Sequence, residues 1–331
     1  MKWSKSVILA VAAVALAGAA QAQDAAKLTP LSMRLNWQMK GEFAPFVVGV
    51  VNGYFRAEGL DVKINEGSSA TQALQSVVNG SDDLAYVPAV QLIQSVNTGM
   101  PVKAVATVVK EDSMGMVAKS KVKLSSPKDL EGRTVEISAA STISQIWPAF
   151  AAKNRIDLSK VKVVRVAPSA RFNLLLGDQV DVLGDIFMTN EYPVLQAKVP
   201  GGLNTFRVGD YGFKIIGYTI VASDKLMSEH PDLIRHFNAA AMKAFKFAAD
   251  HPAEAAAIAA KAYPLALQEE TTKGQVDQLD AFLKLGTPTQ LFAGSDAGWT
   301  ETLGLLKESG AISEQKAPGA YYTNAFLPAG S

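Results

Sequence analysis

The stretch LNWQMKGEFAPFVVGVVNGYFRAEGLDVKI, residues 35–64, decides the fold of this chain. Apolar and polar residues alternate over 33–37 and again over 60–64, which is the period-two pattern of a strand. Residues 44–55 are apolar at nearly every position, which predicts one largely buried helix that Gly59 helps to end. The stretch is therefore predicted to be a βαβ unit. Because open α/β sheets bind ligands beyond the carboxyl ends of their strands, the loop after the first strand is a candidate binding loop.

Length and composition predict a globular protein with room for two lobes. The chain has 331 residues, of which 48% are hydrophobic, and its formal net charge is +1. Lys2 and Lys5 belong to the leader described next, so the mature chain is close to neutral. Nucleic-acid binding needs a concentrated basic face, and we therefore expect no nucleic-acid partner. A near-neutral balance does not exclude an anionic small molecule, which a single cleft can hold.

Residues 1–22 have the pattern of a cleaved secretory signal. Two lysines precede an apolar run over 7–17, and Ala20-Gln21-Ala22 fits the small-x-small cleavage rule. This run is shorter than the ~20 residues of a membrane-spanning helix, so cleavage after Ala22 is favoured over an uncleaved anchor. The chain contains no cysteine, which excludes a lipid-modified cysteine, disulfides and thiol chemistry. We expect a soluble periplasmic protein.

The order of motifs along the chain resembles a known family of solute-binding proteins. An LxW strand, a loop and GYF-x-x-EGLDV-x-I open the mature chain, residues 126–135 read SPKDLEGRTV, and residues 177–185 read GDQVDVLGD. These motifs are similar to those of the SsuA/thiamine-pyrimidine-synthase-like, or NMT1-like, periplasmic solute-binding proteins of ABC importers. The similarity covers nearly the whole mature chain. It implies the α/β fold of a type II periplasmic binding protein, in which two lobes, each a mostly parallel sheet flanked by helices, enclose a ligand cleft.

Within that fold we expect lobe I to comprise residues 23–113 and 218–331, and lobe II to comprise residues 114–217. Hydroxyl-rich strand-to-helix turns at 67–71 and 138–142 fit two lobes that face each other across a cleft. Backbone N–H groups at such turns bind an anion or the polar edge of a ligand, although simple helix capping is an alternative explanation. From these turns and a further strand end we expect ligand contacts at Gly67, Ser68, Ser69, Pro88, Ser138, Ser141 and Thr142.

A second group of candidates follows the strand predicted at 180–185. Asp185, Phe187, Asn190 and Glu191 lie at or after the end of that strand, on the expected cleft side. Asn190-Glu191 matches an Asn-Glu pair that the resemblance associates with pyrimidine- and flavin-type members. A solvated helix carboxylate is the alternative interpretation of Glu191. The first binding loop and the later return to lobe I add the candidates Asn36, Trp37, Glu42, Phe43 and Tyr211.

These side chains favour a planar ligand that carries N–H donors. Trp37, Phe43 and Phe187 would stack on its ring. Asp185 and Glu191 would accept hydrogen bonds from its amino or ring N–H groups, and the hydroxyls of the two turns would donate to its oxygens. We therefore expect a thiamine-type pyrimidine or a similar heteroaromatic. An alkanesulfonate, nitrate or another organic anion is the alternative; it suits two carboxylates and no obvious cleft arginine less well, although helix N-termini can bind anions without arginine.

Motifs for catalysis, metals and cofactors are missing. The three histidines, His230, His236 and His251, all lie in the C-terminal helical stretch, and the first two are spaced wrongly for a zinc helix. There is no P-loop, no GxGxxG fingerprint and no GxSxG elbow. A yeast thiamine-pyrimidine synthase of this fold family depends on a cysteine-rich iron motif and an active-site histidine, so a similar enzyme is disfavoured. We expect no enzyme activity, cofactor or metal, and a monomer whose partners are a small solute and an ABC permease with its ATPase.

Overall fold

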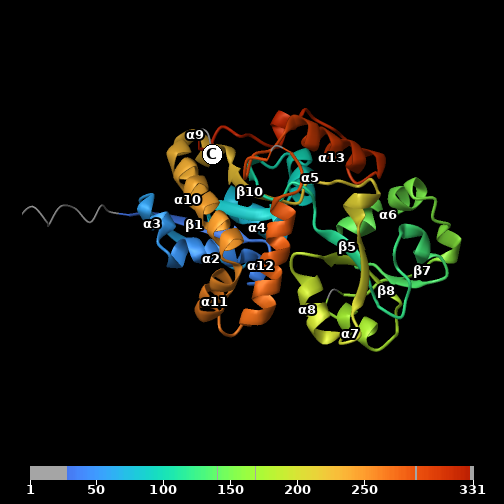
Figure 1. Ribbon diagram of the computed structural model, residues 1–331. Helices are drawn as coiled ribbons and strands as arrows, with labels where there is room; N and C mark the ends of the chain where they lie inside the picture. The colour runs from blue at the N-terminus through green and yellow to red at the C-terminus, as the bar shows by residue number, and fades with distance from the viewer. Residues whose placement is uncertain (1–27, 140, 168, 288, 329–331) are drawn as a thin grey trace, which may run out of the picture.

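The computed structural model describes residues 28–139, 141–167, 169–287 and 289–328, and it shows two lobes side by side (Figure 1). Each lobe is built on a five-stranded sheet with helices packed around it. The expected signal peptide, residues 1–22, lies outside the described residues. Within the described ranges, no helix combines the length and apolar character needed to cross a membrane.

The sheet of the first lobe combines strands from distant parts of the chain. Its strand order is β2-β1-β3-β10-β4, and β10 runs antiparallel to both of its neighbours while the other strands share one direction. Met33 of β1 is paired with Ile64 of β2, which joins the two alternating runs of the opening βαβ unit. The strands are β1 (Thr29–Leu35), β2 (Leu60–Asn65), β3 (Leu84–Pro88), β4 (Val102–Thr107) and β10 (Tyr218–Ser223).

The sheet of the second lobe repeats this plan. Its order is β7-β6-β8-β5-β9, with β5 antiparallel to both of its neighbours. Two mostly parallel sheets flanked by helices are the fold class that the sequence predicted, and that prediction is confirmed. The strands are β5 (Met114–Lys119), β6 (Thr134–Glu136), β7 (Lys162–Val164), β8 (Val182–Phe187) and β9 (Leu203–Arg207).

The helix predicted over 44–55 is two helices, α2 (Ala44–Val51) and α3 (Tyr54–Ala57). Gly53 separates them with a φ of +72°, a left-handed conformation that glycine adopts without steric cost and that ends a helix. The expectation of one largely buried helix is therefore wrong at this end, where Val51 is 56% exposed.

The remaining helices pack around the two sheets, and α10 lies along α2 and α3 (Figure 1). They are α4 (Ala70–Val78), α5 (Ala89–Asn97), α6 (Thr142–Lys153), α7 (Arg171–Leu176), α8 (Glu191–Lys198), α9 (Asp224–Glu229), α10 (Pro231–Asp250), α11 (Pro252–Ala262), α12 (Glu269–Leu283) and α13 (Asp296–Glu308). The short 3-10 helices are η1 (Gly41–Phe43), η2 (Pro127–Leu130), η3 (Leu158–Lys160), η4 (Val208–Tyr211) and η5 (Pro318–Ala320).

The chain crosses between the sheets twice, once between β4 and β5 and once between β9 and β10. The two crossing segments lie side by side. The backbone N–H of Gly217 donates to the carbonyl of Val109 at 2.9 Å, and that of Asp112 donates to the carbonyl of Ile215 at 2.6 Å. The strand memberships agree with the expected division into lobes, while the limits at residues 113 and 217 stay predictions.

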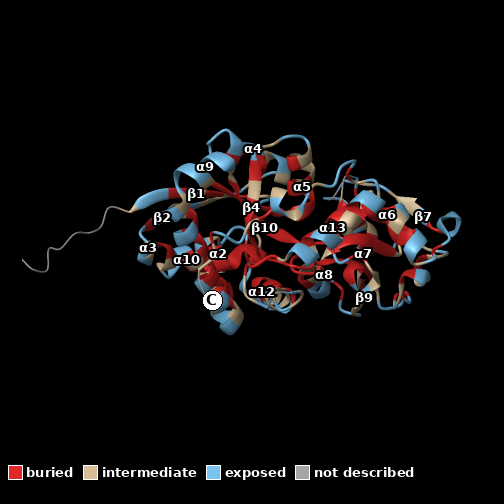
Figure 2. Cartoon of the chain, turned by 90° about the horizontal axis from the view of Figure 1, so that it is seen from above, coloured by how far each residue is buried: buried red, intermediate tan, exposed pale blue. Residues whose placement is uncertain are grey.

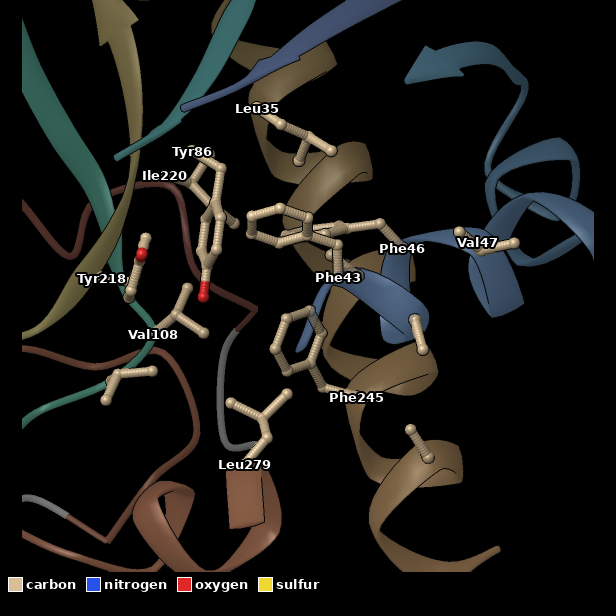
Figure 3. Close-up of a cluster of buried hydrophobic side chains, with 14 of the residues drawn as sticks. Leu35, Phe43, Phe46, Val47, Tyr86, Val108, Tyr218, Ile220, Phe245 and Leu279 are labelled. Atoms are coloured by element: carbon tan, nitrogen blue, oxygen red, sulfur yellow. The ribbon is translucent and has the colours of Figure 1, made fainter. Parts of the chain in front are cut away.

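Aromatic side chains fill the core of the first lobe (Figure 3). Phe46 of α2 packs edge-on against Tyr86 of β3 and Phe245 of α10, with ring centroids 5.0 Å apart in both pairs. Fully burying such a side chain stabilises the fold by about 1.5–3 kcal/mol. Figure 2 shows that buried residues follow the strands and the inner faces of the helices. Aromatic side chains of the C-terminal helices belong to the core as well, since Phe245 and Trp299 are fully buried.

Candidate functional site

A cleft of about 1120 Å³ lies between the two lobes. One wall is formed by the ends of β1 and β3 and the starts of α4 and α5, and the opposite wall by the starts of α6, α7 and α8 and the end of β8. The segment that joins α11 to α12 lines a third side. The cleft therefore lies at strand ends, as predicted for open α/β sheets, and its volume is slightly above the ~300–1,000 Å³ of small-molecule pockets.

The wall of the first lobe presents an aromatic ring and two unpaired amide oxygens. Trp37 follows β1 and is 42% exposed, and Nζ of Lys40 lies 5.9 Å from its ring centroid. Oδ1 of Asn36 and Oε1 of Gln91 are buried and accept no hydrogen bond from any described residue. The other side of the Asn36 amide bonds to the hydroxyl of Tyr218. An unsatisfied buried acceptor costs about 1–3 kcal/mol, so both oxygens suit a ligand that donates hydrogen bonds.

The wall of the second lobe is organised by Arg171, the first residue of α7. Its Nη1 lies 2.7 Å from Oδ1 of Asp185, and its Nη2 pairs with the carboxylate of Glu191. Asp185 also accepts a hydrogen bond from the backbone N–H of Ser138 at 3.2 Å, and Glu191 accepts one from that of Phe187 at 3.1 Å. The Arg171 side chain is only 6% exposed. These charges are therefore held in fixed positions at the cleft surface.

A third carboxyl group, that of Glu136 at the end of β6, lies buried behind this wall. Its Oε1 accepts a hydrogen bond from Oγ of Ser138 at 2.9 Å, and its carboxyl group also forms a hydrogen bond with Asp185. Burial and the nearby Asp185 carboxylate raise the pKa of Glu136 to about 7. The wall thus holds three carboxyl groups around one guanidinium, and its balance is negative. No acidic or histidine cluster in the described ranges is arranged to hold a metal ion.

The sequence indicated no arginine in the cleft, and this expectation is wrong. Residues 171–176 form the short helix α7. Its first residue lies against the end of β8, so the guanidinium is directed into the cleft wall, where it also approaches the carbonyl of Asp185 at 3.3 Å. The alternative view of Glu191 as a solvated carboxylate is wrong too, because its side chain is ion-paired and 18% exposed.

Glu42, expected as a ligand contact, lies behind the cleft instead of in its wall. It belongs to η1, and its carboxylate accepts hydrogen bonds from Oγ1 of Thr189 at 2.8 Å and from Nδ2 of Asn190 at 3.3 Å. Both donors belong to the second lobe. Burial raises the pKa of the Glu42 carboxyl, which is 3% exposed. The residue therefore joins the two lobes, and its predicted contact with a ligand does not agree with this position.

Four other expected contacts also lie away from the cleft surface. Phe43 is fully buried and packs edge-on against Tyr86, so it has no free face for stacking (Figure 3). Gly67 allows a close approach of two loops, since a Cβ there would lie 2.0 Å from the carbonyl oxygen of Leu35. Ser68 is exposed beside the cap of α4, and the hydroxyl of Tyr211 donates to the carbonyl of residue 125 at 2.9 Å within the second lobe.

The structure brings the other eleven expected residues together around the cleft. The two hydroxyl-rich turns are helix N-caps: Oγ of Ser69 accepts from the backbone of Gln72, and Oγ of Ser141 accepts from the backbone of Ser144. These caps fit the simpler explanation for the turns, yet both serines also line the cleft. The lining candidates are Asn36, Trp37, Ser69, Pro88, Ser138, Ser141, Thr142, Asp185, Phe187, Asn190 and Glu191.

Sequence reasoning missed the lining residues that come from helix faces and from the C-terminal segment. Gln91 lies one turn into α5, and only the fold shows that it faces the cleft. Leu265 is fully exposed in the connection between α11 and α12, at the edge of the cleft. The other missed residues include Arg171, Phe172, Thr272 and Gln275.

The fold and the interlobe cleft define the class of two-lobe periplasmic binding proteins. The structure superimposes with a TM-score of 0.70 on the periplasmic aliphatic sulphonate binding protein SsuA from Escherichia coli, at 14% sequence identity, over 88% of this chain and 91% of that one. At this identity the likeness shows the fold alone. Residues 40–255 match the family model described as NMT1/THI5 like, which is more than half of the chain. The chain belongs to the NMT1/THI5-like family.

Two relatives resemble this chain over most of its length. A formylaminopyrimidine-binding protein of Halalkalibacterium halodurans is 26% identical over 311 residues, covering 91% of this chain and 92% of the relative. A riboflavin-binding protein of Chloroflexus aurantiacus, RibY, is 25% identical over 323 residues, covering 92% of this chain and 88% of the relative. Both names describe binding proteins for nitrogen heteroaromatics.

Proposed function

We propose that this protein is the solute-binding component of an ABC importer and that it binds an amino-bearing heteroaromatic, such as a thiamine-type pyrimidine, in the interlobe cleft. The observation that carries the ligand class is the pair of unpaired buried acceptors in the first-lobe wall, Oδ1 of Asn36 and Oε1 of Gln91. An exocyclic amine or a ring N–H supplies the donors that these oxygens lack. The relatives named for a formylaminopyrimidine and for riboflavin support the same ligand class.

The rest of the cleft suits such a ligand. Trp37 offers a partly exposed ring on which a heteroaromatic can stack, and Phe187 lines the cleft from the second lobe. The carboxylates of Asp185 and Glu191 give the second-lobe wall a negative balance, which attracts amine donors. A heteroaromatic amine that stacks on the first-lobe wall and is attracted to the carboxylates of the second-lobe wall would therefore contact both lobes.

A sulfonate or another organic anion is the second candidate, and the sulphonate-binding structural neighbour is its motivation. The only guanidinium that lines the cleft in the described residues belongs to Arg171, and Asp185 and Glu191 already neutralise it. The helix starts at Ser69 and Ser141 are capped by their own hydroxyls. An anion would therefore meet the carboxylates of Asp185 and Glu191 on the second wall and free amide oxygens on the first, while Lys40 and Lys198 are the lysines that line the cleft among the described residues.

Solute capture would proceed by closure of the two lobes around the ligand. The paired crossing segments, with Gly217 bonded to Val109, are the natural hinge, because they are the backbone that joins the sheets. A ligand that contacts both lobes shifts the open–closed equilibrium by its greater affinity for the closed form. We propose that the mature protein acts in the periplasm as a monomer, is not an enzyme, and delivers its solute to a membrane permease with an attached ATPase.

A thermal-shift screen over aminopyrimidines, flavins, sulfonates and nitrate tests the ligand class, since a ligand that binds only the folded form raises the melting temperature. The best aminopyrimidine is then compared, by titration calorimetry, with its analogue in which oxygen replaces the amine. Gln91→Met removes one acceptor at similar size and should weaken binding of the amine about tenfold, with little effect on the oxygen analogue. Gln75→Met on the exposed face of α4 is the matched control. A protein stabilised by sulfonates and not by any amine would overturn the proposed ligand.

A further inference from the structure

At the back of the cleft, four side chains from the two lobes form a cluster that we call the interlobe clamp: Glu42 and Gln275 from the first lobe, and Thr189 and Asn190 from the second. Nε2 of Gln275, in α12, donates to the carbonyl of Asn190 at 2.7 Å, and Oε1 of Gln275 accepts from the backbone of Gly41 at 2.8 Å. Each lobe therefore holds the other through buried hydrogen bonds. All four residues are at most 5% exposed.

The clamp fixes which way the Asn190 side chain points. Nδ2 of the Asn190 amide donates to Oε1 of Glu42 at 3.3 Å, so this side of the amide faces Glu42. The carbonyl oxygen Oδ1 must then point the other way. Asn190 lines the cleft, and its Oδ1 accepts no hydrogen bond from any residue in the described ranges. The clamp therefore leaves a third amide oxygen free beside the ligand cavity.

Close packing around the clamp keeps Glu42 in place. Oγ1 of Thr189, which donates to Glu42, is in turn 3.0 Å from Oγ of Ser113 at the crossing into the second lobe. A Cβ on Gly41 would lie 2.2 Å from Oε1 of Gln275, so the glycine permits this approach. Hydrogen bonds in such a dry interior are strong, and a partner left without its bond is costly.

We infer that Glu42 is a positioning residue: from the first lobe it orients the amide of Asn190 in the second lobe so that this amide presents only its carbonyl oxygen to the solute. The inference rests on the proposed function for the identity of the solute, an amine donor. This arrangement couples solute recognition to the interlobe geometry. Glu42 can orient Oδ1 of Asn190 only while the two lobes are close enough for the Glu42–Asn190 hydrogen bond to form. Glu42 itself is not among the residues that line the cleft.

Glu42→Gln tests this role, because the new amide can donate to Asn190 as well as accept from it and so permits the Asn190 amide to turn over. In the full mature chain without ligand, the side-chain amide signals of Asn190, identified by their loss in Asn190→Ala, should shift or split in the variant. Glu58→Gln is the matched control, since Glu58 lies in the first lobe and pairs on the surface with His236. It should leave the Asn190 signals unchanged. Unchanged signals in Glu42→Gln would overturn the inference.

Affinity provides the second readout. Glu42→Gln should weaken binding of the best aminopyrimidine about tenfold in the wild-type background and have almost no further effect in the Asn190→Ala background. Equal losses in both backgrounds would show that Glu42 does not act through Asn190. If no aminopyrimidine binds the wild-type protein, the proposed ligand class fails, and the ligand-free signals of Asn190 alone then decide whether Glu42 orients this amide.

Discussion

The first-lobe wall of the cleft offers a ring and neutral amide oxygens without partners, whereas the second-lobe wall offers charges that are paired with one another and leaves Nε of Arg171 without a partner among the described residues. Asn36 and Gln91 keep free acceptors, and Trp37 keeps a partly exposed face. In contrast, the Nη groups of Arg171 already form ion pairs with Asp185 and Glu191. The first wall is therefore suited to direct recognition, and the second wall to setting the electrostatic potential in which recognition takes place.

This difference has a consequence for stability. An unpaired neutral acceptor costs about 1–3 kcal/mol of folding free energy, and the ligand-free protein can tolerate this cost. A buried charge without its partner costs far more, so the charged wall has to be complete in the folded chain itself. Substitutions in the first wall should therefore act on binding, and substitutions in the second wall on folding. Three predictions test this division.

The largest effect is expected from Arg171→Met. Removing the guanidinium leaves the carboxylates of Asp185 and Glu191 without their partner, and breaking an ion pair as buried as that of Arg171 with Asp185 destabilises a protein by about 3–5 kcal/mol. Urea unfolding at neutral pH measures the loss. Arg235→Met is the matched control, because its pair with Asp232 is on the surface and should matter by less than about 1 kcal/mol. Similar small losses in both variants would contradict the charged-wall interpretation.

A middle-sized effect concerns Glu136 and has a definite direction with pH. Burial and the Asp185 carboxylate raise the pKa of Glu136 from 4.5 to about 7 in the folded protein. Between these values the folded state holds the proton more tightly than the unfolded chain does, so the free energy of unfolding should fall as the pH rises through this window and then level off. The fall from this group is on the order of 3 kcal/mol.

Glu136→Gln isolates that contribution. The amide stays neutral at every pH, so the variant should lose this part of the slope and exceed the wild type in stability above pH 7. Asp112, whose pKa burial also raises to about 7, should leave a residual slope in the variant. Denaturant unfolding of both proteins from pH 4.5 to pH 8 measures the difference. A variant that keeps the full wild-type slope would show that Glu136 is not the titrating group.

The sequence alone predicted the strands and helix starts that surround the cleft, because strand alternation and turn residues are local signals. The alternating runs around 33–37 and 60–64 became β1 and β2, and Ser69 and Ser141 became the caps of α4 and α6. The carboxyl ends of parallel strands meet at one edge of the sheet. Residues that follow these strands therefore lie close together there, whatever contacts their side chains make. Eleven of the expected contacts line the cleft for this reason.

The errors arose where the answer depends on contacts distant in the sequence. Trp37 and Phe43 belong to one loop, yet η1 turns Phe43 inward against Tyr86 while Trp37 stays at the edge of the cleft. No periodicity separates two aromatics six residues apart in an irregular segment. Arg171 was missed because its partners lie 14 and 20 residues further along the chain and reach it only through the pairing of β8 with β6.

The smallest effect is expected from Trp37→Ala, and it should fall on binding alone. The ring is 42% exposed at the edge of the cleft, so its removal leaves no core cavity, and the melting temperature should stay within the error of the control. Loss of a stacking surface should weaken binding of the best aminopyrimidine by about 1–2 kcal/mol, measured by titration calorimetry. Trp37→Phe keeps an aromatic face and should recover most of the affinity. If Trp37→Ala instead unfolds at a clearly lower temperature while the folded fraction binds as before, the Trp37 ring supports the fold. The claim that substitutions in the first-lobe wall act on binding and not on folding would then be wrong.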